Sequence, residues 1–565
     1  MKLWNMLLLL LALLAIGGCG EREAADDRSR ATASTTQPTI QSTTQSSLPA
    51  TLPAKLAPNR PELALPIAGE KLVIAHYMTG MIPSPQGETG WLDLSREDPA
   101  GPTAAVGGLY QTRPMVSEVY PGLLPLEQAA LFEMRAAKLL GIDGFNFYYP
   151  LGPDEAFRDR YDRYVLAFFD AAEANDLDFK LTLCLSPLGG ELSVDEKANV
   201  FGEHLKTIWE KTSESDNWLK TPDGRLLVYT WLPDAFVARE LTGRHWEIRD
   251  RPELVGEIAR ACNSIASVAG VEAAFLYHLD QIDQPGLTDA VLDHFPAVYA
   301  WVSVGDDLPR LREIASHARE RNRTYVQEVH PDYYTSKVYP IGGHDLIGDV
   351  DEVLRLGTGN IERHAQILGV TQTFREKLDL ALELDSPLIN VTTWNDFPEG
   401  HHLAPEATHH FGFSLLLKDY VRRWRGGEAT PEDDTVAVFF KKYRSDVTPD
   451  PFNIRVVQKK AIAPASEDDF LEVVTMLKAP GRLSICGDAP IDAPAGLHVS
   501  RVPLVAGLVA AVVKRDGEIV AAVTADQEVL SAPRRTDRLT YSKSNRYDEI
   551  RGKIFSPATT QPAVE

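Results

Sequence analysis

The sequence predicts an α/β protein built on a closed (β/α)8 barrel, the TIM-barrel fold, followed by a small C-terminal β-sandwich. Eight short apolar runs alternate with segments of helical spacing, the pattern of parallel strands joined by crossover helices. Most of the runs are apolar on both faces, as is typical of parallel strands covered by helices. An open doubly wound sheet is the alternative, but no glycine-rich phosphate-binding motif follows an early run. We therefore expect the closed barrel.

The predicted strands are apolar, β-branched runs bounded by turn residues. They span residues 72–78, 142–148, 179–185, 226–231, 273–279, 296–304, 324–329 and the run that begins at 387. Helical spacing predicts helices at residues 126–140, 157–174, 198–210, 253–266, 308–319, 361–384 and 412–424. The carboxyl ends of all strands of such a barrel meet at one mouth, so polar residues at those ends are the candidates for a functional site.

The chain begins with the layout of a bacterial lipoprotein signal peptide, predicted for residues 1–19. Lys2 precedes an apolar run over residues 6–16 that is too short to span a membrane. The sequence Ile-Gly-Gly-Cys that follows resembles a lipobox, which implies that Cys19 is lipidated; secretion without a lipid is the alternative. We therefore expect an exported bacterial lipoprotein, periplasmic or at the cell surface, whose only membrane attachment is this anchor.

The remaining segments differ in composition. Residues 20–66 are rich in Thr, Ser and Pro, with almost no large apolar residues, so we predict a disordered linker. The barrel takes residues 67–428. Short strands between Gly, Pro and Asp turns predict a β-sandwich accessory domain over residues 429–530. The polar residues 531–565 are predicted to be a disordered tail.

Charge and cysteine content exclude several classes of protein. The net charge of −23 argues against nucleic-acid binding, which requires basic patches, and fits a secreted enzyme acting on a neutral polysaccharide. Beyond residue 19 the chain has only Cys184, Cys262 and Cys486, so neither a disulfide framework nor a cysteine metal site is expected. The sequence carries no signal for an oligomeric state.

Histidine spacing gives no indication of a metal site. His401-His402 and His409-His410 are adjacent pairs and not i, i+4 pairs on one helix face. No H-E-x-x-H motif occurs, and no nucleophile elbow of the G-x-S-x-G type occurs. We therefore predict no metal and no cofactor.

The strongest cluster of candidate catalytic residues follows the eighth predicted strand. Asp396 and Glu399 lie at or just past its carboxyl end, on a turn that Pro398 and Gly400 break, and ligands bind at this end of α/β sheets. Two acids at this spacing suit the cleavage of a glycosidic bond, because one protonates the leaving oxygen while the other activates water. The alternative is a turn whose acids cap the next helix, with Trp394 in the core.

Residues 393–401 have the sequence Thr-Trp-Asn-Asp-Phe-Pro-Glu-Gly-His. This resembles Thr-Trp-Asn-Asp-Tyr-Gly-Glu-Ser-His of glycoside hydrolase family 71, the α-1,3-glucanases or mutanases. It is also similar to the Trp-Asn-Glu-x-x-Glu-Gly loop of the related family 99 endo-α-mannosidases. The resemblance implies that Asp396 and Glu399 are the two catalytic acids. Pro398 and Gly400 replace the family's Gly and Ser, which changes the shape of the subsite and leaves both acids in place.

The resemblance to family 71 also implies inversion of the anomeric centre. Inversion needs a gap of roughly 6.5–9.5 Å between the two carboxyls so that water fits between them. We assign Glu399 as general acid and Asp396 as general base, and we expect the acid to have a raised pKa. Trp394 and Asn395 would position the sugar, and His401 is a sugar contact or a partner of Glu399.

Further substrate contacts are predicted near the ends of other strands. His76 and Tyr77 lie in a His-Tyr-Met run that resembles the Ala-His-Phe-Met of family 71, and Asp143 matches an Asp-Gly-Phe of its second strand. The alternatives are a structural His and an Asp that fixes a strand start. Four further candidates, which are alternatively core or turn residues, are Asn146, Tyr148, Trp231 and Asp280.

These patterns favour one function over two alternatives. The preferred function is a glycoside hydrolase that cleaves an α-linked polysaccharide, as an endo-α-1,3-glucanase with an inverting acid/base mechanism. The first alternative is a family 99-like endo-α-mannanase, in which an acid assists attack by a sugar hydroxyl; its first acid is usually Glu, so Asp396 disfavours it. The second is a surface lipoprotein that binds glycan without cleaving it.

Overall fold

The structure is a computed structural model that describes residues 61–88, 114–152, 154–188, 192–237, 248, 251–303, 307–335, 337–342, 347, 350–449, 455–458, 465–533 and 538–556. The predicted signal peptide, Cys19 and most of the predicted linker lie outside these ranges. The end of that linker is folded: η1 (Pro61–Ala64) is a 3-10 helix, and the Leu63 side chain is buried. No helix among the described residues is both long enough and apolar enough to cross a membrane.

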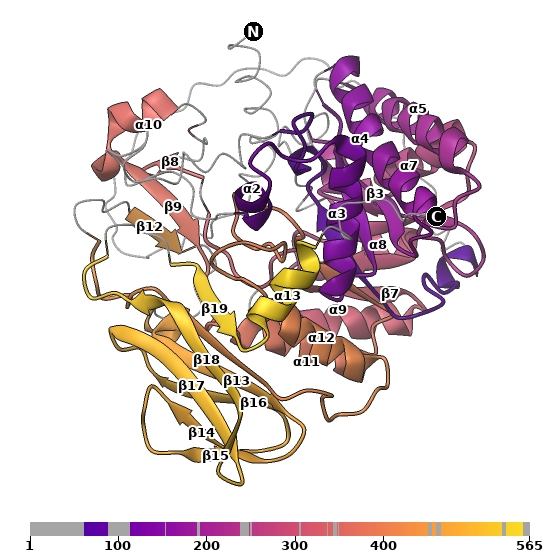
Figure 1. The fold of residues 1–565 in the computed structure, drawn as a ribbon. Helices are drawn as coiled ribbons and strands as arrows, with labels where there is room; N and C mark the ends of the chain where they lie inside the picture. Colours follow the sequence, from indigo (N-terminus) through magenta and orange to yellow (C-terminus); the bar gives the residue numbers. More distant parts are fainter. Residues whose placement is uncertain are drawn as a thin grey trace, which may run out of the picture.

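Eight parallel strands close into a barrel, which confirms the predicted fold (Figure 1). They follow one another around the barrel in chain order, and the last pairs with the first, Leu388 opposite Leu72. The strands are β1 (Leu72–Tyr77), β2 (Gly144–Pro150), β3 (Lys180–Ser186), β4 (Leu226–Thr230), β5 (Ala273–His278), β6 (Ala297–Tyr299), β7 (Thr324–Val329) and β10 (Leu388–Val391). The predicted positions are correct, although β6 is much shorter than predicted.

Among the described residues, one helix of eight or more residues follows each barrel strand and covers the outside of the barrel. These helices are α3 (Leu126–Leu139), α4 (Glu155–Ala174), α5 (Val194–Thr212), α7 (Val255–Ala269), α8 (Pro285–His294), α9 (Leu308–Glu320), α11 (Gln372–Leu384) and α12 (Gly412–Trp424). Helix α8 was not predicted, since only four of its ten residues are buried. Shorter connecting helices are α2 (Met115–Val119), α10 (Val350–Leu356), η2 (Thr79–Met81), η6 (Pro233–Phe236), η7 (Pro252–Leu254), η9 (Thr358–Asn360) and η10 (Ala465–Asp468).

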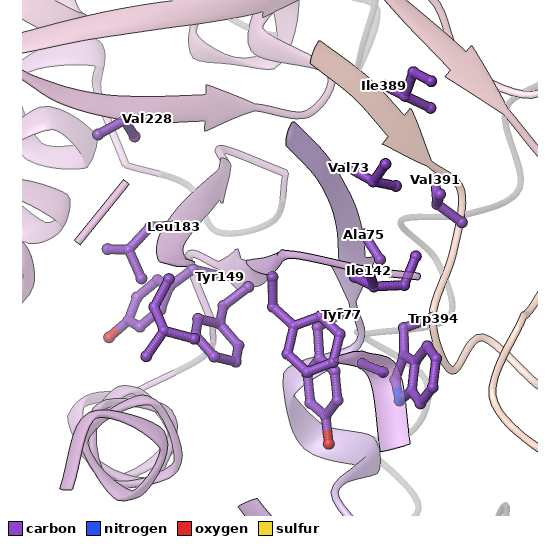
Figure 2. Packing of buried hydrophobic residues seen from close by; sticks show 14 of the residues in the cluster. Val73, Ala75, Tyr77, Ile142, Tyr149, Leu183, Val228, Ile389, Val391 and Trp394 are labelled. Atoms are coloured by element: carbon purple, nitrogen blue, oxygen red, sulfur yellow. The ribbon is translucent and has the colours of Figure 1, made fainter. Parts of the chain in front are cut away.

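Successive side chains along each barrel strand point alternately towards the covering helices and towards the barrel interior. Tyr77, Phe145 and Phe147 belong to the large apolar core between the strands and the helices, part of which Figure 2 shows. Each fully buried side chain of this kind contributes about 1.5–3 kcal/mol to stability. His76 and Asn146, one position along each strand, face the barrel interior, where they contact each other. The outward residues therefore hold the fold, and the inward ones line the mouth.

The predicted helix over residues 361–384 is wrong in its first part. Strand β9 (Ile361–Ala365) occupies that part, and helix α11 begins only at Gln372. Gly369 and Val370 separate the two elements, each with φ of +61°, a left-handed conformation that interrupts a helix. Strand β9 lies between β8 (Tyr339–Pro340) and β12 (Arg455–Gln458) in a small sheet, and all five of its residues are buried, which places buried side chains on both faces. Both-face burial removes the alternation that would have indicated a strand.

The C-terminal β-sandwich is confirmed, with two four-stranded sheets in the orders β16-β13-β11-β19 and β15-β14-β17-β18. The strands are β11 (Thr435–Lys441), β13 (Phe470–Leu477), β14 (Gly481–Ile485), β15 (Ile491–Ala493), β16 (Gly496–Pro503), β17 (Gly507–Arg515), β18 (Glu518–Val529) and β19 (Thr540–Ser544). Apolar residues from both sheets, such as Val438 of β11 and Val513 of β17, form one core between them. This packing is what makes the two sheets a sandwich.

The prediction of a disordered tail over residues 531–565 is wrong for residues 538–556. Strand β19 pairs with β11, and its Tyr541 is buried in the sandwich core. Helix α13 (Tyr547–Ile554) then returns to the barrel, where the Phe555 ring lies 5.7 Å from that of Phe132 on α3. The segment is polar on average, but its few apolar residues are spaced so that each reaches an existing core.

Candidate active site

The turn over residues 393–401, which follows β10, is fixed to the barrel by hydrogen bonds at both ends. The Trp394 N–H donates to the His76 carbonyl at 2.7 Å, and the Thr393 N–H donates to the His401 carbonyl at 2.8 Å. Gly400 has φ of +76°, and a Cβ there would lie 2.6 Å from the Tyr334 carbonyl oxygen. Only glycine fits that position, so the turn has one shape and its side chains have fixed directions.

Asp396 and Glu399 are brought together by this turn. The Glu399 N–H donates to Asp396 Oδ1 at 3.1 Å, and the Asp396 N–H donates to Thr393 Oγ1 at 2.8 Å. An oxygen of each carboxyl and a nitrogen of His401 all lie within 4.8 Å of one another. The side chains are nearly buried, with exposed fractions of 3% for Asp396 and 4% for Glu399. The pair is closer than the separation predicted for inversion, because the backbone amide of one acid binds the carboxyl of the other.

Glu399 has two basic partners. The Lys337 ammonium forms a buried ion pair with its Oε1, and His401 Nε2 lies 3.1 Å from its Oε2. Burial raises the pKa of Glu399, but Lys337 and His401 outweigh that effect and hold it well below its usual range. Glu399 is therefore a carboxylate in the resting protein.

Asp396 has the opposite shift. Burial, and secondly the charge of Glu399, raise its pKa above the usual range. The raised pKa that we expected for the proton donor is thus found at Asp396 and not at Glu399. The physical reason is Lys337, whose ammonium contacts only Glu399 of the two acids among the described contacts.

Lys337 was not found from the sequence, because no motif marks a lysine in a long loop after a strand. Its own N–H donates to Thr335 Oγ1 at 2.8 Å, and that hydroxyl donates to the Pro398 carbonyl at 3.1 Å. The loop after β7 is thereby attached to the 393–401 turn. The neighbouring Tyr333 stacks on the His401 ring at 5.7 Å. His401 is therefore a partner of Glu399, which was one of its two predicted roles.

His76 and Asn146 lie beside this turn on the inner face of the barrel. His76 Nδ1 lies 2.7 Å from Asn146 Oδ1, and the Asn146 amide donates to Asn390 Oδ1 at 2.9 Å. Burial lowers the pKa of His76 to about 3, so its ring is neutral. The edge of its ring meets Trp301 at 4.9 Å. Three adjacent strands, β10, β1 and β2, thus present a linked row of neutral polar groups.

Tyr148 and Trp231 continue the mouth lining on β2 and just past β4. Their rings meet edge to face at 5.7 Å, and Trp231 also lies 6.0 Å from Trp301. The Tyr148 hydroxyl and the Trp231 Nε1–H are buried without a hydrogen-bond partner among the described residues. Aromatic faces with unused donors are what a sugar ring requires, so both residues remain candidates for substrate contact.

Two predicted sugar contacts lie in the core instead, as Figure 2 shows. The Tyr77 ring packs against Phe145 at 4.8 Å on the outer side of the strands. Trp394 is fully buried in the same core, and its Nε1–H donates to Glu133 Oε2 at 2.5 Å. Both predictions are wrong because the strand alternation turns these rings towards the helices. For Trp394 the alternative stated above, a core residue, is correct.

Two more predicted contacts have structural roles, and a third follows another barrel strand. Asp143 precedes β2 at the amino end of the barrel, where it accepts from the Val73 N–H at 2.7 Å and pairs with Arg425, so its alternative role at a strand start is correct. The Asn395 side chain accepts from the Met78 N–H at 2.7 Å and ties the turn to β1. Asp280 lies just past β5, and its charge acts on Tyr277 of the outer core.

A second buried charged group supports the floor of the site below the loop after β7. Glu328 pairs with Lys377 of α11 and lies 2.9 Å from His330 Nδ1. Burial opposes ionisation of Glu328, but Lys377 and His330 lower its pKa to about 2. His330 Nε2 lies 3.2 Å from Gln366 Oε1. The charge of this third carboxylate is balanced by Lys377, so we assign Glu328 a structural role.

Comparison with known proteins agrees with the resemblance predicted from residues 393–401. Residues 369–541 match the sequence model of Glycosyl hydrolase family 71, a range that includes the acid pair. A mutanase from Penicillium rubens is 30% identical over 162 residues, which are 25% of this chain and 35% of the mutanase. The chain thus spans about a third of the length of that curated relative.

Solved structures of glycoside hydrolases are similar at low sequence identity. The GH99 endo-α-mannosidase from Bacteroides thetaiotaomicron is 11% identical with a TM-score of 0.38, and the match covers 63% of this chain and 97% of that one. A glycosyl hydrolase family 2 member from Bacteroides cellulosilyticus is 11% identical with a TM-score of 0.40, and the match covers 81% of this chain and 46% of that one.

Proposed function

We propose that the protein is a glycoside hydrolase that cleaves an α-linked polysaccharide, as an endo-α-1,3-glucanase. One observation carries the proposal. Two buried carboxyls with opposite pKa shifts face each other at the carboxyl end of the barrel, inside the segment that matches family 71. Pairs of acids whose environments separate their pKa values are the usual machinery of glycosidic cleavage.

In the proposed reaction Asp396 is the proton donor and Glu399 is the base. The glycosidic bond between the anomeric carbon and the leaving oxygen breaks, and that oxygen takes the Asp396 proton. A water oxygen bonds to the anomeric carbon, and its proton goes to Glu399. This assignment reverses the one expected from the sequence, because Lys337 holds the pKa of Glu399 low, while burial and the charge of Glu399 raise the pKa of Asp396.

The proposal requires the two carboxyls to separate when the glycan enters. One oxygen of each carboxyl now lies within 4.8 Å of the other, closer than the roughly 6.5–9.5 Å between carboxyl groups that inversion needs. The crystal structure of the inactive Asp396→Asn variant with an α-1,3-linked oligosaccharide tests this requirement. We expect a separation of roughly 6.5 Å or more for an inverting enzyme. An unchanged short separation with sugar bound would exclude the inverting route.

The short separation favours a second candidate, a family 99-like endo-α-mannanase. In that reaction an acid assists attack by a hydroxyl of the sugar itself, so no water has to fit between the carboxyls in the first step. NMR of the first-formed anomer separates the two candidates, because the second one retains the anomeric configuration.

A substrate panel tests the function directly. The full chain is incubated with α-1,3-glucan, α-mannan and α-1,4-glucan, and soluble oligosaccharides are measured. We expect products from α-1,3-glucan, and none from the variants Asp396→Asn and Glu399→Gln. The matched controls are Asp385→Asn and Glu383→Gln, exposed acids at the end of α11 that should keep full activity. Binding of glycan without products in the wild-type chain would identify a glycan-binding protein instead.

A further inference from the structure

We propose that His402, Glu406 and His409 bind a divalent transition-metal ion, and that Zn²⁺ fits this donor set best. No metal site is predicted from the sequence, where the histidines form two adjacent pairs. The fold takes one histidine from each pair and places both beside Glu406, so that one ligand atom of each residue lies within 4.8 Å of the others. Two imidazoles and one carboxylate are a common set of protein ligands for zinc.

The spacing of the three groups suits an ion better than direct contact. His402 Nε2 lies 3.9 Å and His409 Nδ1 lies 3.8 Å from the same oxygen, Glu406 Oε1. Both distances exceed a hydrogen bond. Ligands of a tetrahedral zinc ion lie about 3.3 Å apart, so each histidine nitrogen would move about half an ångström closer to Glu406 Oε1. The two histidine nitrogens, which lie within 4.8 Å of each other, would approach by up to about 1.5 Å.

His402 supplies the second, independent observation. Its ring is fully buried, and neither ring nitrogen has a hydrogen-bond partner in the described part of the chain. The ring packs against Phe397 at 4.7 Å, so no solvent reaches it from that side. A buried imidazole without a partner is destabilising and needs an explanation. A metal ion bound to one nitrogen would give the ring a partner.

His409 is oriented as metal-binding histidines usually are. Its Nε2 lies 3.4 Å from Asp332 Oδ2, a carboxylate that favours the proton on Nε2. Nδ1 then presents a lone pair towards Glu406 Oε1, and it also lies 3.3 Å from the His402 carbonyl oxygen. Lone pairs facing one another in a buried place require a cation or an extra proton. A doubly protonated His409 is the competing state, and it would bind no metal.

The other two groups of possible ligands are less suitable. Asp396, Glu399 and His401 already have the Lys337 ammonium beside them, which supplies the positive charge that a metal would bring. In the group on α4 and α5, His204 is hydrogen-bonded to Asp162 at 2.7 Å and the third member, Asp159, is exposed. The His402 group is buried, and both nitrogens of the His402 ring lack a hydrogen-bond partner in the described part of the chain, whereas in His401 only Nδ1 lacks one.

The proposed ion would join three parts of the molecule. His402 directly follows the 393–401 turn, and Glu406 accepts the N–H groups of Thr408 and His409 in the next turn. Asp332 also binds Lys441 of the sandwich strand β11, with Nζ 3.2 Å from Oδ1. At this position the ion would stabilise the junction between barrel and sandwich next to the 393–401 turn, and it would take no part in the proton transfers.

Metal content of the full chain tests the proposal. The chain is purified with a tag that binds no metal, dialysed, and analysed by elemental mass spectrometry. We expect about one ion per chain, as a three-ligand site requires. After removal of the ion with a chelator, addition of Zn²⁺ should raise the melting temperature and saturate at one equivalent, and Co²⁺ should give the visible absorption of a tetrahedral site.

Three variants locate the ion. His402→Ala and His409→Ala should each abolish stoichiometric binding, and Asp332→Asn should weaken it by about 10–100-fold. The matched control is His410→Asn: His410 lies outside the group, 2.7 Å from the Ser542 carbonyl, and its positive φ suits asparagine. A wild-type chain without metal, whose melting temperature does not respond to Zn²⁺, would overturn the proposal even if the variants fail to fold. Full binding in both alanine variants would also overturn it.

Discussion

Two buried glutamates on opposite sides of the 393–401 turn have opposite charge states. Glu133 of α3 accepts the Trp394 Nε1–H on the core side, and Glu399 faces Lys337 on the mouth side. Each is 4% exposed. Burial raises the pKa of Glu133 to about 8, since among the described residues it has hydrogen-bond donors but no cation. Lys337 and His401 reverse that effect at Glu399. Burial therefore does not decide which acid is reactive; the cation does.

The largest loss of activity should come from replacing either of the two reactive acids. Asp396→Asn and Glu399→Gln should each lower glycan cleavage by about 10²–10⁴-fold, the usual contribution of general acid–base catalysis. An α-1,3-oligoglucosyl fluoride distinguishes them, because fluoride leaves without a proton. We expect Asp396→Asn to cleave the fluoride at near wild-type rate and Glu399→Gln to remain inactive. The reverse pattern would restore the assignment made from the sequence.

Removing the cation should make Glu399 resemble Glu133. Lys337→Met removes the ammonium and leaves the buried Glu399 carboxylate with His401 as its remaining basic partner, which costs about 3–5 kcal/mol of stability at neutral pH. The wild-type pKa is depressed, so this stabilisation is present above the unfolded pKa of about 4.3 and is lost as pH falls below it. The gap in urea midpoint between wild type and variant should therefore shrink at acidic pH.

The pH–rate profile gives a second measurement on the same variant. The base must be ionised, so a raised Glu399 pKa moves the acidic limb upwards, by about 1–3 pH units if the nearby cation is the cause. The control is Lys478→Met, a lysine about half exposed beside Asp433, which should change neither limb nor midpoint. An unshifted limb in Lys337→Met would show that Lys337 does not set the charge of the pair.

Glu133 allows the converse test. In the wild type its folded-state pKa is raised, so the folded protein holds a proton that the unfolded chain releases, and stability falls as pH rises from about 4.3 towards 8. Glu133→Gln is neutral at every pH and keeps the acceptor for Trp394. We expect wild type and variant to unfold alike at pH 5, and the variant to be more stable at pH 8 by on the order of 3 kcal/mol. Equal stabilities at pH 8 would contradict the raised pKa.

The sequence predicted the barrel, the sandwich and the acid pair for the same reason: each depends on local pattern. Apolar runs indicated the strands, and the residues after β10 gave Asp396 and Glu399. The failures need long-range information. Lys337 and Glu133 act on residues far away in the sequence: the Lys337–Glu399 pair has a separation of 62, and the Glu133–Trp394 pair one of 261. The local sequence also does not show whether Tyr77 or His76 points into the barrel, because adjacent residues of a strand point to opposite faces.

The smallest change in stability should come from replacing Trp394, the hydrogen-bond donor to Glu133 on the core side of the turn. Trp394→Phe keeps an aromatic ring in the core but removes the Nε1–H that Glu133 accepts. The loss of a hydrogen bond to a buried acceptor should cost about 1–3 kcal/mol of stability. The Michaelis constant for glycan should stay unchanged, because the ring faces α3 and not the mouth. Tyr148→Phe is the matched comparison: it removes a mouth-side hydroxyl, and should raise the Michaelis constant without changing the urea midpoint. If Trp394→Phe instead weakened glycan binding, the turn would have to rotate on binding, and the separation of core and mouth faces would not hold at this position.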